Sequence, residues 1–442
     1  MLEVLVIVLA IVIDYMLLFA VGVLFVVATI IFYSREPVLS AIGFSVLSFC
    51  ILWEQFVGEL SVPVVDICLS FGVVLFIARA IAEGGYSFRW SSLTIAMFIF
   101  IVLIIVGLVL GFLYGRDSTL ILLEGRNLLY YALFFVALAA IQRSGQISLL
   151  WWMMIIVGVV TVQYIGLLIA AGAFLRIPTY HADIFPLMIP LAIAALVYEK
   201  SAVVRIGCTV LLILYFLGLL ISMARAEWVG TGVAVMVLFF FLIWDKKLTL
   251  GASLMIFVIV ASLLFVAFFL DSGIFIRLSN VIPKSEIGSR ASSIGSAFGD
   301  MSFLMRVELN YTAFVRFLHF PIFGAGLGDV VNYKILYIGS TWSLDTSHLQ
   351  ILWKMGVVGF MAYCWLLVAA LKRSSYVFWN STTQFGKWLG AGIFSGLCGL
   401  IVLATFSAAI TKYNLNIIIA IVLAFIEYEA TQIQNSLKKL IE

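Results

Sequence analysis

The chain has 442 residues, of which 65% are hydrophobic and only 11% are charged. Soluble domains carry about 25% charged residues, so this composition excludes an ordinary soluble protein and indicates an integral membrane protein. The formal net charge of +3 is small and dispersed, and it gives no reason to expect a nucleic-acid partner.

Apolar runs of roughly 17–25 residues recur along the chain, which is the length of helix that crosses about 30 Å of hydrocarbon. Barrel strands would instead alternate apolar and polar residues. We therefore predict an all-α polytopic membrane protein with about 12–14 transmembrane helices. The expected spans are 15–32, 38–54, 62–81, 92–114, 120–141, 148–172, 184–199, 203–222, 226–244, 249–270, 348–371, 386–410 and 414–430.

One long polar loop, residues 271–347, interrupts the apolar runs. It divides a single integrated domain into an N-terminal transmembrane bundle (1–270), the loop, and C-terminal transmembrane helices (348–442). Residues 301–320 of the loop carry apolar side chains at helical spacing, which predicts an amphipathic helix that lies on the membrane surface or caps the bundle.

Basic residues predict the orientation, because cytoplasmic loops are enriched in Lys and Arg. If Lys246-Lys247, Lys372-Arg373 and Lys438-Lys439 are cytoplasmic, the loop at 271–347 is extracytoplasmic. In a bacterium with two membranes, this multi-pass protein of the inner membrane would have the loop, and any active site on it, on the periplasmic side.

Two arginines stand out near the predicted outer boundary. Arg225 lies where two spans meet, two residues before Glu227, and Arg306 opens the surface helix with Glu308 close by. A guanidinium matches phosphate oxygens with a planar fork of donors, so both arginines are candidates for holding a diphosphate. The alternatives are a snorkelling or Glu227-paired Arg225, and an ordinary headgroup contact for Arg306.

Asp345 and His348 precede a long apolar helix and lie on one face of it if the helix starts at Asp345. An aspartate that orients an imidazole is a recurrent general-base arrangement, so both are catalytic candidates. In the alternative, Asp345 or Ser347 caps the helix and His348 packs at the membrane interface.

Weaker polar groups could line the same cleft. His181 with Asp183 lies on another predicted outer connection, and Glu124, Arg126 and Asn127 are close enough to pair along one helix. A self-neutralised structural cluster is the alternative for the latter three. The three histidines are dispersed and the five cysteines lie in or beside apolar runs, so we expect no metal site and no cofactor.

The glycine-rich segment 321–328 predicts a tight turn with close backbone approach. It follows a helix and lacks the Lys-Ser/Thr ending of a nucleotide-binding loop. His319, just before it, is expected to be structural.

Taken in order, these segments resemble the O-antigen ligase and polymerase family over roughly residues 120–371. The resemblance rests on Arg225 in a Ser-x-x-Arg-x-x-Trp setting, on Arg306 heading a helix that runs into Pro-x-x-Gly-x-Gly, and on Leu-Gln-x-Leu…Gly-x-x-Gly at 349–359. Where the family commonly has a histidine, this chain has Asp345, and His348 follows about one helical turn later. Ligases of the family depend on that histidine whereas polymerases vary there, so the substitution favours a polymerase.

The resemblance implies transfer of a glycan from a polyprenyl (undecaprenyl) diphosphate to an acceptor sugar hydroxyl without a metal. Arg225 and Arg306 would stabilise the diphosphate leaving group, and His348 or Asp345 would take the proton. The expected partners are the lipid-linked glycan donor, a glycan or lipid A–core acceptor, membrane lipids and a candidate chain-length regulator. A ligase acting on lipid A–core is the alternative, and a lipid or polysaccharide transporter or flippase is a more distant one.

Overall fold

The computed structural model describes residues 90–144, 150–151, 153–155, 157–158, 161–162, 182–222, 225–247, 301–333 and 339–442. Four expected spans (15–32, 38–54, 62–81 and 249–270), most of the span 148–172 and residues 271–300 of the loop lie outside these ranges. Nearly all the described residues belong to one compact unit, made of residues 89–138 and 154–442.

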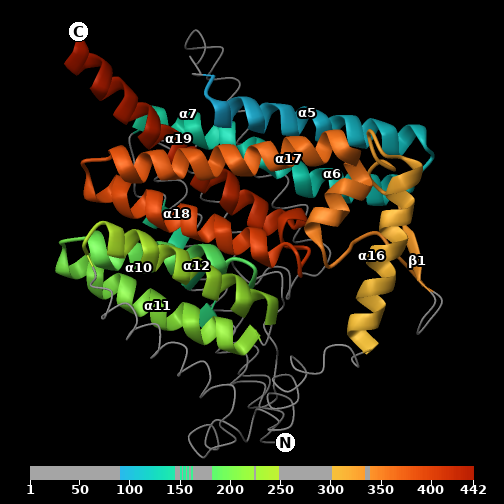
Figure 1. The fold of residues 1–442 in the computed structure, drawn as a ribbon, viewed down its shortest axis with the longest axis horizontal. Helices are drawn as coiled ribbons and strands as arrows, with labels where there is room; N and C mark the ends of the chain where they lie inside the picture. The colour runs from blue at the N-terminus through green and yellow to red at the C-terminus, as the bar shows by residue number, and fades with distance from the viewer. Residues whose placement is uncertain are drawn as a thin grey trace, which may run out of the picture. The chain divides into compact units, whose positions relative to one another are not determined.

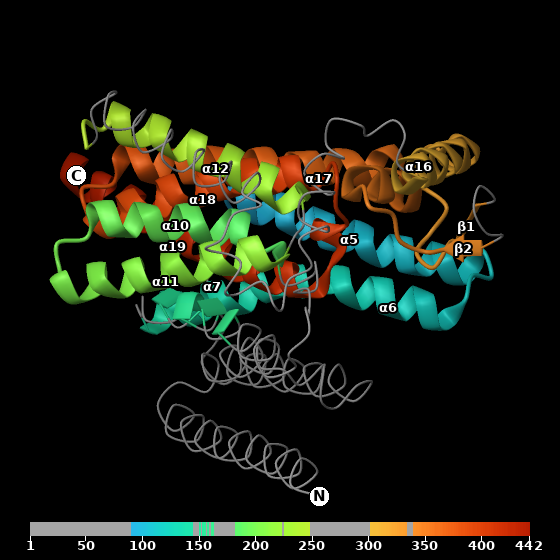
Figure 2. The ribbon, with the colours of Figure 1, turned by 90° about the horizontal axis from the view of Figure 1, so that it is seen from below.

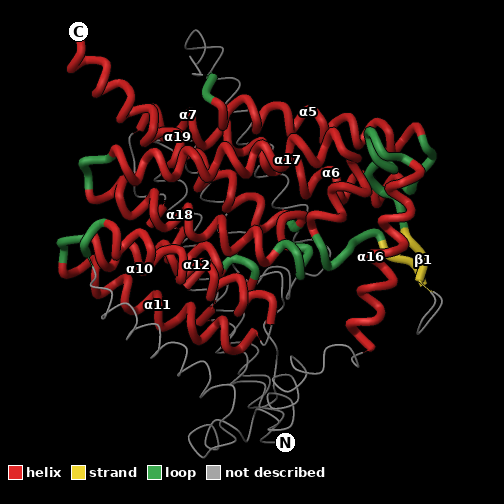
Figure 3. The backbone as a smooth tube through the Cα atoms, in the orientation of Figure 1, coloured by secondary structure: helices red, strands yellow, loops and turns green. Residues whose placement is uncertain are grey.

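Apart from one short hairpin, the regular elements in the described part of the chain are helices, joined by loops and turns (Figures 1 and 3). Strands β1 (Val331–Tyr333) and β2 (Gly339–Thr341) pair antiparallel, with Asn332 opposite Ser340. The helices are α5 (Ser92–Leu113), α6 (Ser118–Leu129), α7 (Leu133–Ser144), α10 (Phe185–Tyr198), α11 (Ala202–Ser222), α12 (Arg225–Trp244), α16 (Met301–His319), α17 (Ser347–Asn380), α18 (Gln384–Leu403) and α19 (Tyr413–Ile441), with 3-10 turns η2 (Tyr130–Ala132) and η4 (Ala409–Thr411).

Within the described ranges, 7 helical segments are long and apolar enough to cross a membrane. This finding confirms the predicted class of an all-α polytopic membrane protein. The segments overlap the expected spans 92–114, 120–141, 203–222, 226–244, 348–371, 386–410 and 414–430, although α17 and α19 extend further and α18 ends earlier than expected, while the span 184–199 corresponds to the shorter α10. The total of about 12–14 spans remains a prediction.

Helix α18 packs against α10 and α12 from the earlier part of the chain and against α17 from the later part. The α12–α18 contact is close because glycines face each other there: a Cβ on Gly399 would lie 2.5 Å from the carbonyl oxygen of Gly230. Helix α17, in turn, also packs against α5 (Figure 2). Segments from both ends of the described chain therefore share one bundle.

Helix α17 is broken near its start, which differs from the uninterrupted span expected at 348–371. Gly356 has φ 67° and ψ −170°, outside the helical region, and the φ value favours glycine. The break exposes backbone groups to the glycine-rich segment 321–328, where Ala325 N–H donates to the Trp353 carbonyl at 3.0 Å and Gly326 N–H to that of Lys354 at 3.1 Å. The predicted close backbone approach is present at this crossing.

Helix α16 is the predicted surface helix, and it lies crosswise to α5 and α17 at one end of the bundle (Figure 1). Its buried side carries Leu309 and Ala313, which belong to a core cluster with Leu344 and Trp353. Burial of this side fixes the helix against the start of α17, so α16 is a part of the folded unit and positions Arg306.

Candidate functional site

Arg306 and Asp345 form an ion pair between α16 and the residues that lead into α17. The guanidinium Nε of Arg306 lies 2.7 Å from Oδ2 of Asp345, and the two side chains are 51% and 53% exposed. Exposed pairs of this kind contribute little to stability, about 0–1 kcal/mol. Both charged groups remain accessible to a ligand.

His348 does not contact Asp345, so the expected Asp–His pair is wrong in this arrangement. Nε2 of His348 donates to the Ile401 carbonyl at 3.0 Å, and Nδ1 is 3.1 Å from the Tyr363 hydroxyl. A carbonyl only accepts, so Nε2 carries the proton, and in the neutral ring Nδ1 accepts from Tyr363. Asp345 is instead drawn to the cation of Arg306.

The alternative, in which Asp345 or Ser347 caps α17, is not found either, because neither residue takes the N-cap position. Thr346 is the N-cap residue, and its side chain makes no capping hydrogen bond. Asn310 Nδ2 donates to Thr346 Oγ1 at 3.2 Å, and Ser347 Oγ donates to the Ser407 carbonyl at 2.8 Å. The start of α17 is thereby held between α16 and the connection from α18 to α19.

A buried acidic pair lies beside that connection. Asp183 is fully buried, with Oδ2 2.5 Å from Lys412 Nζ and Oδ1 3.2 Å from the Ser407 hydroxyl. Glu227, in the first turn of α12, is buried next to Asp183, and its Oε2 has no hydrogen-bond partner among the described residues. Ser407 links this cluster to Ser347, the neighbour of His348 in the chain.

Glu124 does not pair with Arg126, which corrects the expected pairing along one helix. Glu124 Oε1 lies 2.7 Å from Lys354 Nζ, with both side chains buried, and Glu124 Oε2 accepts from Gly328 N–H at 2.6 Å. Arg126 reaches Asn127 Oδ1 at 3.4 Å. A buried charge needs a partner of opposite sign, so Glu124 of α6 and Lys354 of α17 hold the two helices together.

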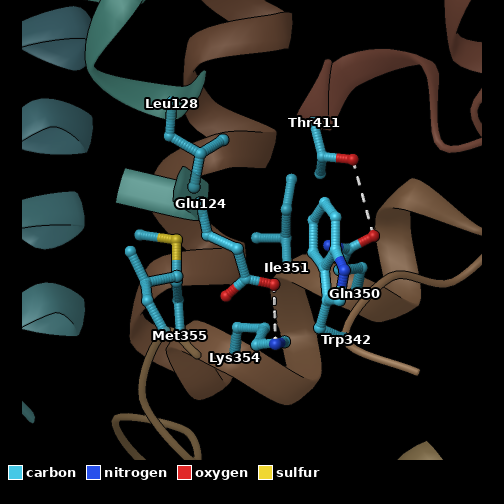
Figure 4. Close-up of a pocket in the computed structure, with 9 residues that line it drawn as sticks. Glu124, Leu128, Trp342, Gln350, Ile351, Lys354, Met355 and Thr411 are labelled. Carbon is cyan, nitrogen blue, oxygen red and sulfur yellow. Dashed lines mark hydrogen bonds and ion pairs between the residues drawn. The ribbon is translucent and has the colours of Figure 1, made fainter. Parts of the chain in front are cut away.

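This ion pair borders a small pocket (Figure 4). In the close-up, Lys354 and Glu124 face each other across one side, and Gln350 and Thr411 are joined on the other. The lining residues are Glu124, Leu128, Leu327, Trp342, Gln350, Ile351, Lys354, Met355 and Thr411. Glu124 is bonded to Lys354 and Gln350 to Thr411, so these side chains join the elements around the pocket and have a structural role.

Asp329, immediately after the glycine-rich segment, is a buried anchor that sequence reasoning missed. Its carboxylate accepts from Arg316 Nε and Nη2 at 3.0 and 3.1 Å and from Trp353 Nε1 at 2.9 Å, and Arg116 Nη1 lies 2.9 Å away. The hydrogen bonds to Asp329 raise the pKa of the Arg316 guanidinium above the usual arginine value. Arg316 is therefore committed to this anchor, unlike the half-exposed Arg306.

The remaining predicted site residues are placed as follows. Arg225 begins α12, although its side chain lies outside the description, and His181 lies outside the described residues. Glu308 is half-buried on α16. His319 Nδ1 donates to the Val315 carbonyl at 2.8 Å, in keeping with a structural role. Within the described ranges, no group of three or more His, Cys, Asp or Glu side chains is arranged to hold a metal ion.

The fold and these clusters define a polytopic helical membrane protein in which charged side chains converge near the break in α17. A family model described as O-Antigen ligase matches residues 210–364, which include α12, α16 and the start of α17. The match agrees with the predicted resemblance to the O-antigen ligase and polymerase family, and it supports glycan transfer of that general type. No curated protein matches the chain.

Proposed function

We propose that this protein transfers a glycan from a polyprenyl diphosphate, such as undecaprenyl diphosphate, to an acceptor sugar hydroxyl on the extracytoplasmic side of the bacterial inner membrane. The observation that carries the proposal is the exposed Arg306–Asp345 pair, which lies within the matched residues. It presents a phosphate-binding cation and a proton-accepting carboxylate side by side, the two groups that displacement of a diphosphate by a hydroxyl requires.

The donor diphosphate competes with Asp345 for Arg306. Nε of Arg306 contacts Oδ2 of Asp345, and a guanidinium has five N–H donors, so it can also donate to a second anion. When the diphosphate takes the guanidinium, the Asp345 carboxylate becomes free to receive the proton of the acceptor hydroxyl. The hydroxyl oxygen then bonds to the anomeric carbon as the bond from that carbon to the diphosphate oxygen breaks.

Negative charge grows on the departing lipid diphosphate, and fixed cations stabilise it. Arg306 supplies one such group. Arg225, at the first residue of α12, supplies the second in this proposal, where the helix N-terminus also favours an anion. In this account the arginines stand in for a divalent cation, and the reaction needs no metal.

His348 has a supporting role in the proposal. Both of its ring nitrogens are engaged, by the Ile401 carbonyl and the Tyr363 hydroxyl, so Asp345 is the more accessible base. His348 fixes the start of α17 relative to α18, and with it the position of Asp345.

A polymerase of O-antigen or exopolysaccharide is favoured over a ligase, because Asp345 occupies the position where ligases of the family carry histidine. The polymerase would use a second lipid-linked glycan as acceptor, and a chain-length regulator is a candidate partner. A ligase acting on lipid A–core is the second candidate. A transporter is less favoured, because the Arg306–Asp345 pair lies in the long loop and its helix boundary.

The test uses purified protein in lipid nanodiscs, given a polyprenyl-diphosphate-linked repeat unit and analysed on gels. A ladder of longer lipid-linked products from the donor alone is the expected result. Transfer only when lipid A–core is added, once per acceptor, would identify a ligase. No covalent product under either condition would overturn the enzymatic proposal.

A further inference from the structure

Helix α16 carries an exposed apolar stripe on the side opposite its buried face. Val307, Tyr311, Phe314 and Leu318 are 49%, 68%, 44% and 57% exposed. Their spacing of three and four residues places them in one line along the helix. Exposed apolar side chains scattered singly are ordinary, but a contiguous line on one helix marks a contact surface.

The stripe belongs to a helix that is fixed at several points. Its opposite side is buried through Leu309 and Ala313. Arg316 is bound to Asp329 near the end of the helix, and Arg306 is paired with Asp345 near the start. The exposure of the stripe is therefore a property of a firmly held helix.

Exposed apolar residues also lie between the stripe and a transmembrane helix. After α16, Ile322 and Phe323 are 61% and 48% exposed, and the Ile322 carbonyl accepts from Val358 N–H at 3.2 Å. From there α17 continues as a membrane-spanning helix with an exposed apolar line of its own, formed by Val357, Met361, Trp365 and Val368. Ile322 and Phe323 lie between the two exposed lines in the chain, and Ile322 lies against the start of the α17 line.

Basic groups mark both ends of the stripe. Arg306 lies at one end, and the exposed His319 lies at the other. Helices that lie in a membrane interface combine an apolar face with basic residues that meet lipid phosphates. A second protein surface would bring no particular need for this combination.

We propose that lipids of the outer leaflet cover the α16 stripe, so that α16 lies in the membrane interface with its apolar side at the boundary between headgroups and acyl chains. Arg306 and Asp345 then sit at headgroup depth, level with the diphosphate of a membrane-embedded carrier. This last step rests on the proposed function, whereas the lipid contact itself does not.

The test is a depth measurement on the full chain in nanodiscs. A nitroxide is attached through a genetically encoded keto amino acid at Tyr311 or Leu318, which leaves the native cysteines unlabelled. Collision with oxygen, which concentrates in lipid, is compared with collision with a water-soluble nickel complex. Met361 on α17, 66% exposed, gives the lipid reference, and Lys438, 72% exposed, gives the water reference.

We expect the labels at Tyr311 and Leu318 to shift clearly from the Lys438 value towards the Met361 value, favouring oxygen. Accessibilities equal to those of Lys438 would overturn the proposal. Strong spin–spin broadening between copies labelled at Leu318 would also overturn it, because a second copy would then cover the stripe. The readout needs no turnover, so lipid contact in a protein without glycan transfer would refute the proposed function and leave this inference standing.

Discussion

Lys354 and Glu124 lie 230 positions apart in the chain, yet their Nζ and Oε1 atoms are 2.7 Å apart in the buried region beside the break of α17. Lys354 Nζ also donates to the Asp329 carbonyl at 2.5 Å. One lysine thus ties α6 and the end of the glycine-rich segment to α17. This tie holds the frame against which α16 presents Arg306.

Breaking that ion pair on one side should destabilise the protein strongly. Glu124→Gln leaves the Lys354 ammonium buried with a weaker partner, and loss of a partner in a buried pair costs roughly 3–5 kcal/mol. We expect a lower thermal transition in detergent for Glu124→Gln and for Lys354→Met. The double variant Glu124→Gln/Lys354→Met should recover part of the loss, and strictly additive losses would mean that the two side chains are not coupled.

Arg306→Lys should impair transfer severely while leaving the fold intact. A lysine presents a point charge in place of a planar fork, and loss of a donor that stabilises a transition state costs about 10²–10³-fold in rate. The measurement is the initial rate of product formation. Arg205→Lys, at an exposed position early in α11, is the matched control and should keep its rate. Near-normal turnover of Arg306→Lys would remove Arg306 from the diphosphate site.

Asp345→Asn should separate catalysis from donor binding. The amide cannot accept the proton, so we expect kcat to fall by about 10²–10⁴-fold. Because the amide also no longer competes as an anion for Arg306, the donor should bind at least as tightly as in the unaltered protein. Steady-state kinetics and donor-binding measurements check this together. A parallel loss of donor affinity would contradict the exchange of partners on Arg306.

His348→Ala should reduce activity more than His319→Ala. His348 connects α17 to the Ile401 carbonyl of α18 and to Tyr363, whereas His319 contacts only its own helix among the hydrogen bonds of the described residues. If His348 acts by positioning, Tyr363→Phe should share part of its defect. Equal and mild effects of the two histidine variants would leave His348 without a role in the site.

A metal chelator should leave transfer unchanged. In the proposed reaction the arginines stabilise the diphosphate, so rates with and without EDTA are expected to agree. Loss of activity that returns on addition of Mg²⁺ or Mn²⁺ would show that a cation shares this task.

The sequence predicted local features better than long-range ones. Helical spacing located α16, and the run of glycines indicated the close backbone approach at 321–328. The Asp–His pair was predicted wrongly, and the alternative cap at Asp345 is absent too, because Thr346 is the N-cap and Asp345 pairs with Arg306, 39 positions earlier in the chain. Asp329 was missed for a similar reason. An aspartate after glycines looks like a turn residue until the fold brings Arg116, Arg316 and Trp353 to it.

The most direct test of the central claim is the gel assay in nanodiscs, run on the unaltered chain and on Arg306→Lys with a polyprenyl-diphosphate-linked repeat unit as the sole substrate. The account predicts a ladder of longer lipid-linked glycans from the unaltered chain and a strongly reduced ladder from the variant. Absence of any covalent product from the unaltered chain, with or without lipid A–core, would contradict the account.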